Sequence, residues 1–457
     1  MYLSKIAELT GYKDFAQLDC LDLDLKGFCI DSRKVQPGFL FVALQGNKVD
    51  GHKFMHEAEN KGAVAILCSQ ANTDLKIAQF VVEDPIITLA KIATDHRRNL
   101  NCPVIALTGS NGKTTVKEMI TNILPKPSYS TLGNLNNHLG VPLSVLQTTA
   151  IHRYAVFELG ANHLGDINYT AAIAKPDVAL INNIGPAHLG EFGSMDTIAS
   201  AKGEIYRALS TSGKAIINDD DLYAHFWDKI IADKEKIGFS AKHPATVHAQ
   251  SIKFDEQYCA NFTLVLPIGT AKIKLQIPGK HSLMNALAAA ACCYAVGIPL
   301  STIVNGLELF QGVRGRMTYL QGKKQALVID DTYNANLDSV LAAIAVLAKR
   351  QGTKILVLGD LNELGIYTKR HHAAIGKVAK QHGIDLLITY GVHSKHAGRI
   401  FGSRARHYNS QKILLKDLEP LLDPNITILV KGSRAAAMEH IVAAITIDAS
   451  STNNAAG

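Results

Sequence analysis

Residues 108–115, which read TGSNGKTT, constrain the fold of this chain more than any other stretch. An apolar run at 104–107 precedes them. Residues 116–123 then carry apolar side chains at the spacing of one helical face, until Pro125, which cannot continue a helix. The pattern predicts a strand, a glycine loop and a helix. Such a loop directs backbone N–H groups and a helix dipole at an anion, so the sequence predicts a phosphate site.

The loop is shorter than the common phosphate-binding pattern GxxxxGK(S/T), because Leu107 stands where the first glycine would fall. An ordinary tight turn is the alternative, and the flanking strand and helix favour phosphate binding. We expect Lys113 to supply a point charge and Thr114 or Thr115 a hydroxyl for Mg²⁺. The predicted phosphate loop comprises Thr108, Gly109, Ser110, Asn111, Gly112, Lys113, Thr114 and Thr115.

The chain of 457 residues exceeds what one hydrophobic core supports, so we expect roughly two to four domains. The formal charge of +7 is spread along the chain apart from residues 96–98, which suits an anionic small substrate and does not indicate nucleic acid binding.

The seven cysteines include no CxxC pair and indicate buried thiols in a reducing compartment. The chain shows neither a signal-peptide pattern nor an apolar run that could span a membrane. We therefore expect a cytoplasmic protein.

Residues 1–100 predict a small α/β unit that ends in a helix at 85–100. Its strand-like runs lie at 39–44, 63–67 and 79–83. Two loops rich in polar residues stand out, at 31–34 and at 45–52. Clustered donors at strand ends are typical of binding loops, and solvated turns have the same composition, so both interpretations stay open.

From residue 104 to about 240, apolar runs alternate with helical patterns, which predicts a mostly parallel sheet with helices on both faces. Ligands bind beyond the carboxyl ends of such strands. There the sequence places Glu158 after one strand and His188 after the next. Both are candidate Mg²⁺ ligands, directly or through water. The alternative for Glu158 is another buried partner, and imidazole is not the ligand that Mg²⁺ prefers.

A lysine falls on the apolar stripe of the helix predicted at 195–209. Lys202 lies four residues after Ile198 and among small residues. Such a lysine usually extends its ammonium group to solvent or forms a salt bridge, and the residues alone favour that outcome. The alternative is a lowered pKa that frees the amine to react with CO₂, giving a carbamate that serves as an extra ligand.

Residues 245–278 change to a period of two, which predicts appended antiparallel strands. The next helix, at 281–295, places His281 and Asn285 on one side, where they either contact a base or ribose or form a buried capping pair. After a glycine-arginine turn at 312–316, strands and helices alternate again and predict another parallel sheet. Polar clusters follow its strands at 331–336, 359–363 and 431–434, which predicts a second binding wall that faces the phosphate loop.

Together these segments resemble the Mur ligases, ATP-dependent amino-acid ligases that build the peptide of the bacterial cell-wall precursor. The resemblance covers essentially the whole chain. Its most specific motifs are TGSNGKTT at 108–115, GNLNNHLGVP at 133–142, FELGANHLGDI at 157–167, NNIGPAHLGEFGSMDTIASAKGEIY at 182–206, and DDTYNANLDS with GDLNELG in the last third. It implies an α/β monomer of three domains, with hinges near residues 102 and 313. The three implied domains are a UDP-substrate domain at 1–101, a central ATP-binding P-loop domain at 102–313 and a Rossmann-like domain at 314–457.

Within the family, the motifs resemble the branch that joins D-alanyl-D-alanine to UDP-N-acetylmuramoyl-tripeptide through an acyl phosphate, with ATP and Mg²⁺ as cofactors. The resemblance reverses the interpretation of Lys202, which it implies is carbamylated and catalytic together with Lys113 and His188. The implied magnesium ligands are Thr114, Thr115, Glu158 and His188. The implied nucleoside contacts are His281, Asn285, Arg316, Asp331 and Asn334. The implied UDP contacts are Ser32, Arg33 and the loop with Asn47, and the implied muramoyl-peptide contacts are Asn134 and Asn137.

One departure and two alternatives remain. Leu337 stands where many relatives have proline, so the turn there is not fixed by the resemblance. The alternative functions are another ligase of the superfamily, similar to folylpolyglutamate synthase, and a non-catalytic protein that uses nucleotide binding only to clamp its domains.

Overall fold

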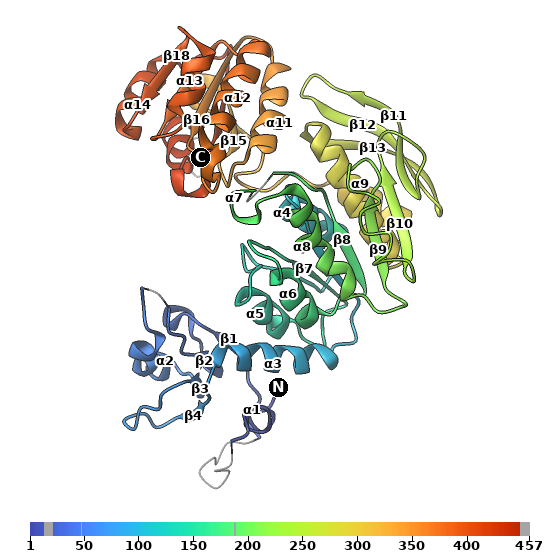
Figure 1. Ribbon diagram of the computed structural model, residues 1–457, viewed down its shortest axis with the longest axis vertical. Helices are drawn as coiled ribbons and strands as arrows, with labels where there is room; N and C mark the ends of the chain where they lie inside the picture. The colour runs from blue at the N-terminus through green and yellow to red at the C-terminus, as the bar shows by residue number, and fades with distance from the viewer. Residues whose placement is uncertain (13–21, 47, 187–188, 448–457) are drawn as a thin grey trace, which may run out of the picture.

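The computed structural model describes residues 1–12, 22–46, 48–186 and 189–447. It contains three β-sheets of four, nine and six strands, each with helices packed on it. Figure 1 shows the three sheets one after another along the long axis, with the N-terminal unit at one end and the C-terminal unit at the other. The α/β fold predicted from the alternation of strands and helices is confirmed.

The N-terminal sheet is parallel throughout, in the order β1-β2-β3-β4. Its strands are β1 (Gly27–Cys29), β2 (Phe39–Val42), β3 (Ala65–Cys68) and β4 (Ala78–Val81), and its helices are α1 (Leu3–Thr10), α2 (Met55–Asn60) and α3 (Pro85–Arg98). Helix α3 begins at Pro85 because the Asp84 carboxylate accepts hydrogen bonds from two N–H groups of the first turn, and proline fits that position. The strands predicted for this unit are confirmed.

Helix α3 also attaches the N-terminal unit to the central one. It packs on α5 (Gly140–Gln147) and α6 (Asp166–Ala174). The buried guanidinium of Arg97 donates to the carbonyl oxygens of Ala174 and Lys175, both at 2.9 Å. One hydrophobic cluster consequently runs from Leu3 through α3 to Ile231.

The central sheet has the order β13-β12-β11-β10-β9-β8-β5-β7-β6. Its strands are β5 (Val104–Thr108), β6 (Ser128–Ser130), β7 (Tyr154–Glu158), β8 (Val178–Ile181), β9 (Lys214–Asn218), β10 (Glu235–Ser240), β11 (Val247–Phe254), β12 (Cys259–Leu266) and β13 (Gly269–Pro278). All pairs from β6 across to β11 are parallel, whereas β11, β12 and β13 pair antiparallel. The predicted antiparallel strands are confirmed, and they extend the central sheet.

Helices cover both faces of the central sheet. One face carries α4 (Lys113–Ile123), α9 (Lys280–Ala295) and α10 (Leu300–Glu308), and the other carries α5, α6 and α8 (Met195–Arg207), which the short α7 (Leu189–Phe192) precedes. In the strand register, Leu107 lies beside Glu158 and Thr108 lies beside Ile181. The glycine loop, Glu158 and the residues after β8 therefore meet at one edge.

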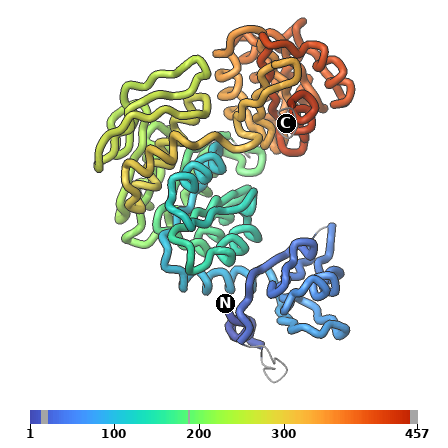
Figure 2. Tube along the Cα trace, turned by 180° about the vertical axis from the view of Figure 1, so that it is seen from behind, coloured from blue at the N-terminus to red at the C-terminus, as the bar shows by residue number. Residues whose placement is uncertain are grey.

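The C-terminal sheet has the order β14-β15-β19-β16-β17-β18, and only β14 runs antiparallel to its neighbour. Its strands are β14 (Thr318–Gln321), β15 (Leu327–Asp331), β16 (Thr353–Gly359), β17 (Leu386–Tyr390), β18 (Ala405–Tyr408) and β19 (Ile426–Lys431). One face carries α11 (Leu337–Ala348), α12 (Thr368–Gln381) and α13 (Lys395–Phe401), and the other carries α14 (Gln411–Leu418) and α15 (Glu439–Ile445). Seen from behind, the chain crosses from the central to the C-terminal unit near residue 313 (Figure 2).

Candidate functional site

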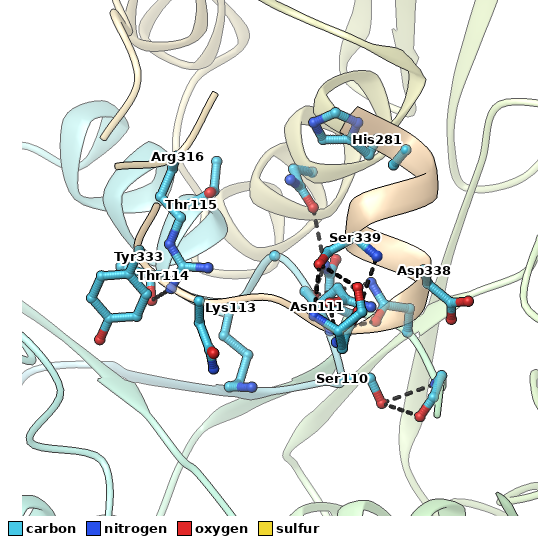
Figure 3. A pocket seen from close by; sticks show the side chains of 18 of the residues that line it. Ser110, Asn111, Lys113, Thr114, Thr115, His281, Arg316, Tyr333, Asp338 and Ser339 are labelled. Atoms are coloured by element: carbon cyan, nitrogen blue, oxygen red, sulfur yellow. Dashed lines mark hydrogen bonds between the residues drawn. The ribbon is translucent and has the colours of Figure 1, made fainter. Parts of the chain in front are cut away.

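The glycine loop connects β5 to α4 at the carboxyl edge of the central sheet (Figure 3). Gly112 ends the loop with a φ of +80°, a left-handed conformation that glycine adopts without steric cost. A Cβ atom there would lie 2.5 Å from Oδ1 of Asn285 and 2.6 Å from Nδ2 of Asn182. Position 112 therefore needs glycine both for its backbone and for the close approach of two asparagines.

Two asparagines that follow β8 fix the backbone of this loop. Asn183 Oδ1 accepts a hydrogen bond from the N–H of Asn111 at 2.8 Å. The Nδ2 group of Asn182 donates to the carbonyl oxygen of Asn111 at 2.9 Å and to Oδ1 of Asn285 at 3.0 Å. No side chain of the described residues caps α4, so its first N–H groups remain available to an anion.

Lys113 lies across the loop, where its Nζ donates to the carbonyl oxygen of Gly109 at 2.8 Å. Burial lowers the pKa of its ammonium group. The Glu158 carboxylate raises this pKa in part, and the positive charge of Arg316 lowers it further. The lysine is thus a partly buried cation held among loop groups, and an incoming phosphate would be its natural partner.

Glu158, at the end of β7, is only 3% exposed. Its carboxylate accepts hydrogen bonds from Oγ1 of Thr114 at 3.0 Å and from Nδ2 of Asn136 at 2.9 Å. Both donors are neutral, so within the described part of the chain no cation forms an ion pair with this carboxylate. A hydroxyl and a carboxylate in contact beside a phosphate loop are the oxygen ligands that Mg²⁺ prefers.

His188 and Asn47 lie outside the described residues. Asn137 Oδ1 accepts from the N–H groups of Leu139 and Gly140 at the start of α5, so it also stabilises that helix end. Within the described residues no group of three His, Cys, Asp or Glu side chains could hold a metal.

Lys202 lies on the buried face of α8 and is 2% exposed. Its ammonium group has no hydrogen-bond or ion-pair partner among the residues that the structure describes. Burial sets its pKa well below the usual value, and the charge of Lys113 lowers it further. The alternative in which this side chain extends to solvent is therefore wrong, because the residue is almost entirely buried where α8 packs on β8 and β5.

Arg316 comes from the segment that enters the C-terminal unit and reaches back to the phosphate loop. Its Nη2 donates to Oγ1 of Thr114 at 3.1 Å, and its guanidinium lies over the ring of Tyr333 at 4.0 Å. Its buried Nε has no hydrogen-bond partner among the residues that the structure describes. A guanidinium with an unused buried donor beside the loop is suited to bind a phosphate oxygen.

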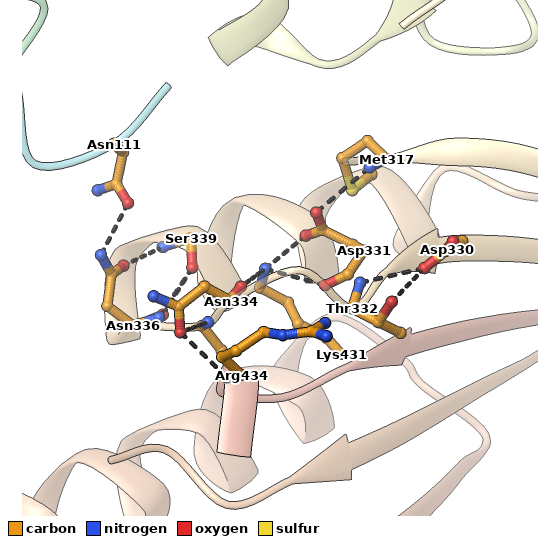
Figure 4. A network of polar contacts seen from close by, with 11 residues as sticks. Asn111, Met317, Asp330, Asp331, Thr332, Asn334, Asn336, Ser339, Lys431 and Arg434 are labelled. Carbon is orange, nitrogen blue, oxygen red and sulfur yellow. Dashed lines mark hydrogen bonds and ion pairs between the residues drawn. The ribbon is translucent and has the colours of Figure 1, made fainter. Parts of the chain in front are cut away.

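The polar wall predicted in the C-terminal unit is present as separate groups of hydrogen-bonded residues at the strand ends (Figure 4). Lys431, 2% exposed, bonds to Oδ2 of Asp331 at 2.6 Å and to the carbonyl oxygen of Asn334 at 3.0 Å. Asn336 Nδ2 donates to Oδ1 of Asn111 at 2.7 Å, which links this wall to the phosphate loop. The ends of β15 and β19 therefore face the loop, as the strand-end pattern predicted.

His281 lies in the first turn of α9, on the opposite side of the loop from Arg316 (Figure 3). Burial lowers the pKa of its imidazole, and the nearby Asp331 carboxylate opposes the shift. The capping-pair alternative for His281 and Asn285 is wrong, because no side chain caps α9 and Asn285 bonds to Asn182 instead.

One cavity of about 1840 Å³ gathers most of the predicted residues. Its lining includes Ser110, Asn111, Gly112, Lys113, Thr114, Thr115, Asn134, Asn137, Glu158, His281, Asn285, Arg316, Asp331 and Asn334. Thr108 is fully buried in β5 beneath the loop, and Gly109 receives the bond from Lys113. The cavity is larger than a typical site for a single small molecule, so it has room for a nucleotide and a second substrate.

Comparison with known proteins agrees with this geometry. Residues 24–109 match the Mur ligase family catalytic domain, residues 107–293 the Mur ligase middle domain, and residues 315–434 the Mur ligase glutamate ligase domain. The UDP-N-acetylmuramoyl-tripeptide–D-alanyl-D-alanine ligase of Escherichia coli (strain K12) is 40% identical over 433 residues, which cover 94% of this chain and 95% of that relative. The chain belongs to the Mur ligase family.

Solved structures match this Mur ligase over nearly its whole length. A crystal structure of MurF from Acinetobacter baumannii has a TM-score of 0.88 and 37% identity, and the match covers 96% of this chain and 97% of the other. MurF from Thermotoga maritima, solved in complex with ADP, has a TM-score of 0.81 and 28% identity, and the match covers 93% and 97%.

The N-terminal candidates of this Mur ligase lie away from the cavity. Ser32 Oγ donates to Oε2 of Glu57 at 2.7 Å, and Arg33 pairs with Asp31 at 2.9 Å. Both lie in a short 3₁₀ turn, Ser32–Lys34, after β1 in the N-terminal unit. The structure therefore does not bring them together with the phosphate loop.

Several residues of the site were not singled out from the sequence. Asn136 holds Glu158, Asn182 and Asn183 hold the loop, and Lys431 holds Asp331. All lie in motifs or polar strand ends that the sequence does show. Asparagine-rich strand ends were the available signal, but the partner of each side chain depends on packing between distant segments.

Proposed function

We propose that this Mur ligase joins D-alanyl-D-alanine to UDP-N-acetylmuramoyl-tripeptide in peptidoglycan precursor synthesis, converting ATP to ADP and phosphate. The observation that carries the proposal is the 40% identity, over 94% of this chain, to a ligase named for those two substrates. The large cavity between a phosphate loop and a second polar wall supports a reaction that must bring a nucleotide and two further reactants together.

In the first step, an oxygen of the tripeptide carboxylate attacks the γ-phosphorus of ATP and ADP leaves, which gives an acyl phosphate. Lys113, the first N–H groups of α4 and Arg316 bind the phosphate oxygens and offset their charge. Thr114, Thr115 and Glu158, with His188 by resemblance, are the residues that would hold Mg²⁺. The contact of Thr114 with Glu158 at 3.0 Å fits such an ion. When bound, the ion would supply charge stabilisation for the transferred phosphoryl group.

In the second step, the neutral amine of D-alanyl-D-alanine attacks the acyl carbon, the bond from that carbon to the phosphate oxygen breaks, and the nitrogen loses a proton. Phosphate and the amide are the products. The acyl phosphate would hydrolyse in water, so the two walls of the cavity must exclude solvent while it exists.

The remaining residues orient the reactants. His281, Asn285, Asp331 and Asn334 hold the nucleoside of ATP. Asn134 and Asn137 face the muramoyl peptide, and Ser32, Arg33 and the loop with Asn47 hold UDP. The neutral amine of Lys202 adds to the carbon of CO₂ and releases a proton, which gives a carbamate that supplies a negative group near Lys113. The lowered pKa of its buried amine supports this role, because only the neutral amine reacts.

We also propose that the enzyme is a monomer that works in the cytoplasm. The six cysteines in the described part of the chain are free and buried, as expected of a protein in a reducing compartment. None of the helices that the structure describes is long and apolar enough to cross a membrane.

The deciding experiment supplies UDP-N-acetylmuramoyl-tripeptide, D-alanyl-D-alanine, ATP and Mg²⁺ and measures phosphate and the amide product. We expect phosphate release that requires both organic substrates. Turnover with a folate and glutamate, and none with the dipeptide, would favour the folylpolyglutamate-type alternative. ATP hydrolysis that ignores every carboxylate and amine would favour a nucleotide-dependent clamp.

A further inference from the structure

The positive charge of this protein is concentrated in one part of the C-terminal unit. Residues 364–416 contain ten Lys and Arg residues and one acidic residue, Asp385, which gives this segment a formal charge of +9. The whole chain carries +7, so the remainder is slightly acidic. The expectation that the charge is spread along the chain, with residues 96–98 as the exception, is therefore wrong for this segment.

Most of these basic residues lie on the outer sides of α12 and α13, which pack beside each other on one face of the C-terminal sheet (Figure 1). At about 100° per residue, the basic positions of each helix fall within about one third of a turn, opposite the buried positions. We call this surface the basic face; it consists of Lys369, Arg370, Lys377 and Lys380 of α12 and Lys395 and Arg399 of α13.

The charges of the basic face are not neutralised within the described part of the chain. None of its six residues forms an ion pair there. Asp385 is shared by Lys354 and Arg404, each at 3.9 Å. Asp360 is occupied by three backbone N–H groups at 392–394. Burial lowers the pKa of His396 on α13, and Arg399, Lys369 and Lys395 lower it further, as a surplus of positive charge requires.

Exposed aliphatic side chains accompany the basic face. Ile366 is 90% exposed just before α12, Val392 is 62% exposed just before α13, and Ile400 is 47% exposed on α13. The large hydrophobic residues exposed between 364 and 416 are all aliphatic in the described chain. A surface that binds single-stranded nucleic acid presents aromatic rings for stacking, whereas a lipid interface accepts basic and aliphatic groups together.

We propose that the basic face docks on an anionic lipid surface, so that the enzyme binds membranes peripherally. This goes beyond the proposed ligase activity and is independent of it, because none of the six basic residues lines the cavity. The attraction is electrostatic and reversible, with the aliphatic side chains adding a small apolar contribution.

The test measures co-sedimentation of the full chain with phosphatidylcholine vesicles that contain or lack phosphatidylglycerol. We expect binding only to the vesicles with phosphatidylglycerol, and release when salt rises from about 0.05 M to about 0.5 M. Equal binding to neutral vesicles, or no binding to anionic ones at low salt, would overturn the proposal. Tighter binding to single-stranded RNA than to the anionic vesicles would overturn it in favour of a nucleic acid partner.

Matched variants locate the surface. The triple variant Lys377→Glu, Lys380→Glu, Arg399→Glu changes three exposed residues of the basic face. The control Lys253→Glu, Lys272→Glu, Lys274→Glu makes the same charge change at exposed positions of β11 and β13. We expect the basic-face variant to weaken vesicle binding about a hundredfold. The control variant should keep most of its affinity for the vesicles.

Equal loss in both variants would mean that net charge, and not this face, is responsible, and would refute the proposal. Ligase turnover and thermal unfolding report whether each variant folds. If the glutamate variant does not fold, the corresponding glutamine variant gives the same comparison with half the charge change.

Discussion

Gly112 is the residue at which local backbone and distant packing impose the same requirement. Its φ of +80° already disfavours other residues, and a Cβ would also push apart the asparagines that hold the loop. We expect Gly112→Ala to weaken ATP binding at least about tenfold, measured by calorimetry, because the loop must shift to relieve the contact.

Gly297 provides the control for backbone strain alone. Its φ is +78°, and no atom lies within 4 Å of a Cβ built there. Gly297→Ala should cost about 1–2 kcal/mol of stability with no change in ATP affinity. If both variants bind ATP as the unmodified protein does, the close approach of Asn182 and Asn285 has no functional importance.

Lys202 is the second residue whose role depends on its surroundings. Because burial lowers its pKa, the neutral amine persists to lower pH than in an exposed lysine, and carbamate formation declines as pH falls through that lowered pKa. We expect Lys202→Ala to reduce ligase turnover about a hundredfold, and acetate or another small carboxylate to restore part of it.

The control for this rescue is chloride at the same ionic strength, which cannot replace a carbamate oxygen. Full turnover of Lys202→Ala without any additive would exclude a catalytic carbamate. Equal rescue by chloride and by carboxylate would show a salt effect instead.

Among the elements, α11 combines a helix cap with a contact between domains. Asn336 Oδ1 accepts from the N–H of Ser339 at 2.9 Å, and its Nδ2 donates to Asn111 at 2.7 Å. Asn336→Ser keeps a capping oxygen but is too short to reach Asn111, whereas Asn336→Ala removes both. In urea unfolding, we expect the alanine variant to lose about 1 kcal/mol more of the free energy of unfolding than the serine variant loses. Both variants should raise the KM for ATP to a similar extent.

This comparison separates the two roles of the side chain. An unchanged KM in both variants would mean that the bond to Asn111 contributes nothing to nucleotide binding. Equal stability of the two variants would mean that the cap contributes nothing to α11.

The strands show where sequence patterns are sufficient to predict secondary structure. Long apolar runs predicted β5, β7, β8 and the four inner strands of the C-terminal sheet, because a strand buried on both faces must be apolar throughout. The edge strands β14 and β18 were not predicted. Each has only four residues, none of them fully buried, so no periodic signal marks it.

On the scale of the whole molecule, the interface between the N-terminal and central units differs in kind from the interface between the central and C-terminal units. The hydrophobic cluster from Leu3 to Ile231 continues across residue 102, whereas the central and C-terminal units have separate cores. Polar contacts such as Arg316 to Thr114 and Asn336 to Asn111 connect the latter pair. We therefore propose that units 1–101 and 102–313 move together and that unit 314–457 turns near residue 313.

Small-angle scattering tests this motion. We expect the radius of gyration to fall when ATP and UDP-N-acetylmuramoyl-tripeptide bind together, and the change to fit a rotation of the C-terminal unit alone. The tripeptide substrate without ATP is the control and should leave the profile nearly unchanged. Identical profiles in all states, or a change that requires the N-terminal unit to move, would contradict the assignment of the hinge.

The sequence by itself determined the α/β class, the strand, loop and helix around residues 108–115, and the polar strand ends that form both walls of the cavity. These features depend on neighbours within a turn or two of chain, which periodicity and glycine placement record. The tertiary structure alone decided that Asn136 holds Glu158, that Lys202 is enclosed, and that the basic residues of two helices share one surface. Those facts depend on contacts between segments far apart in the chain, and no local pattern encodes them.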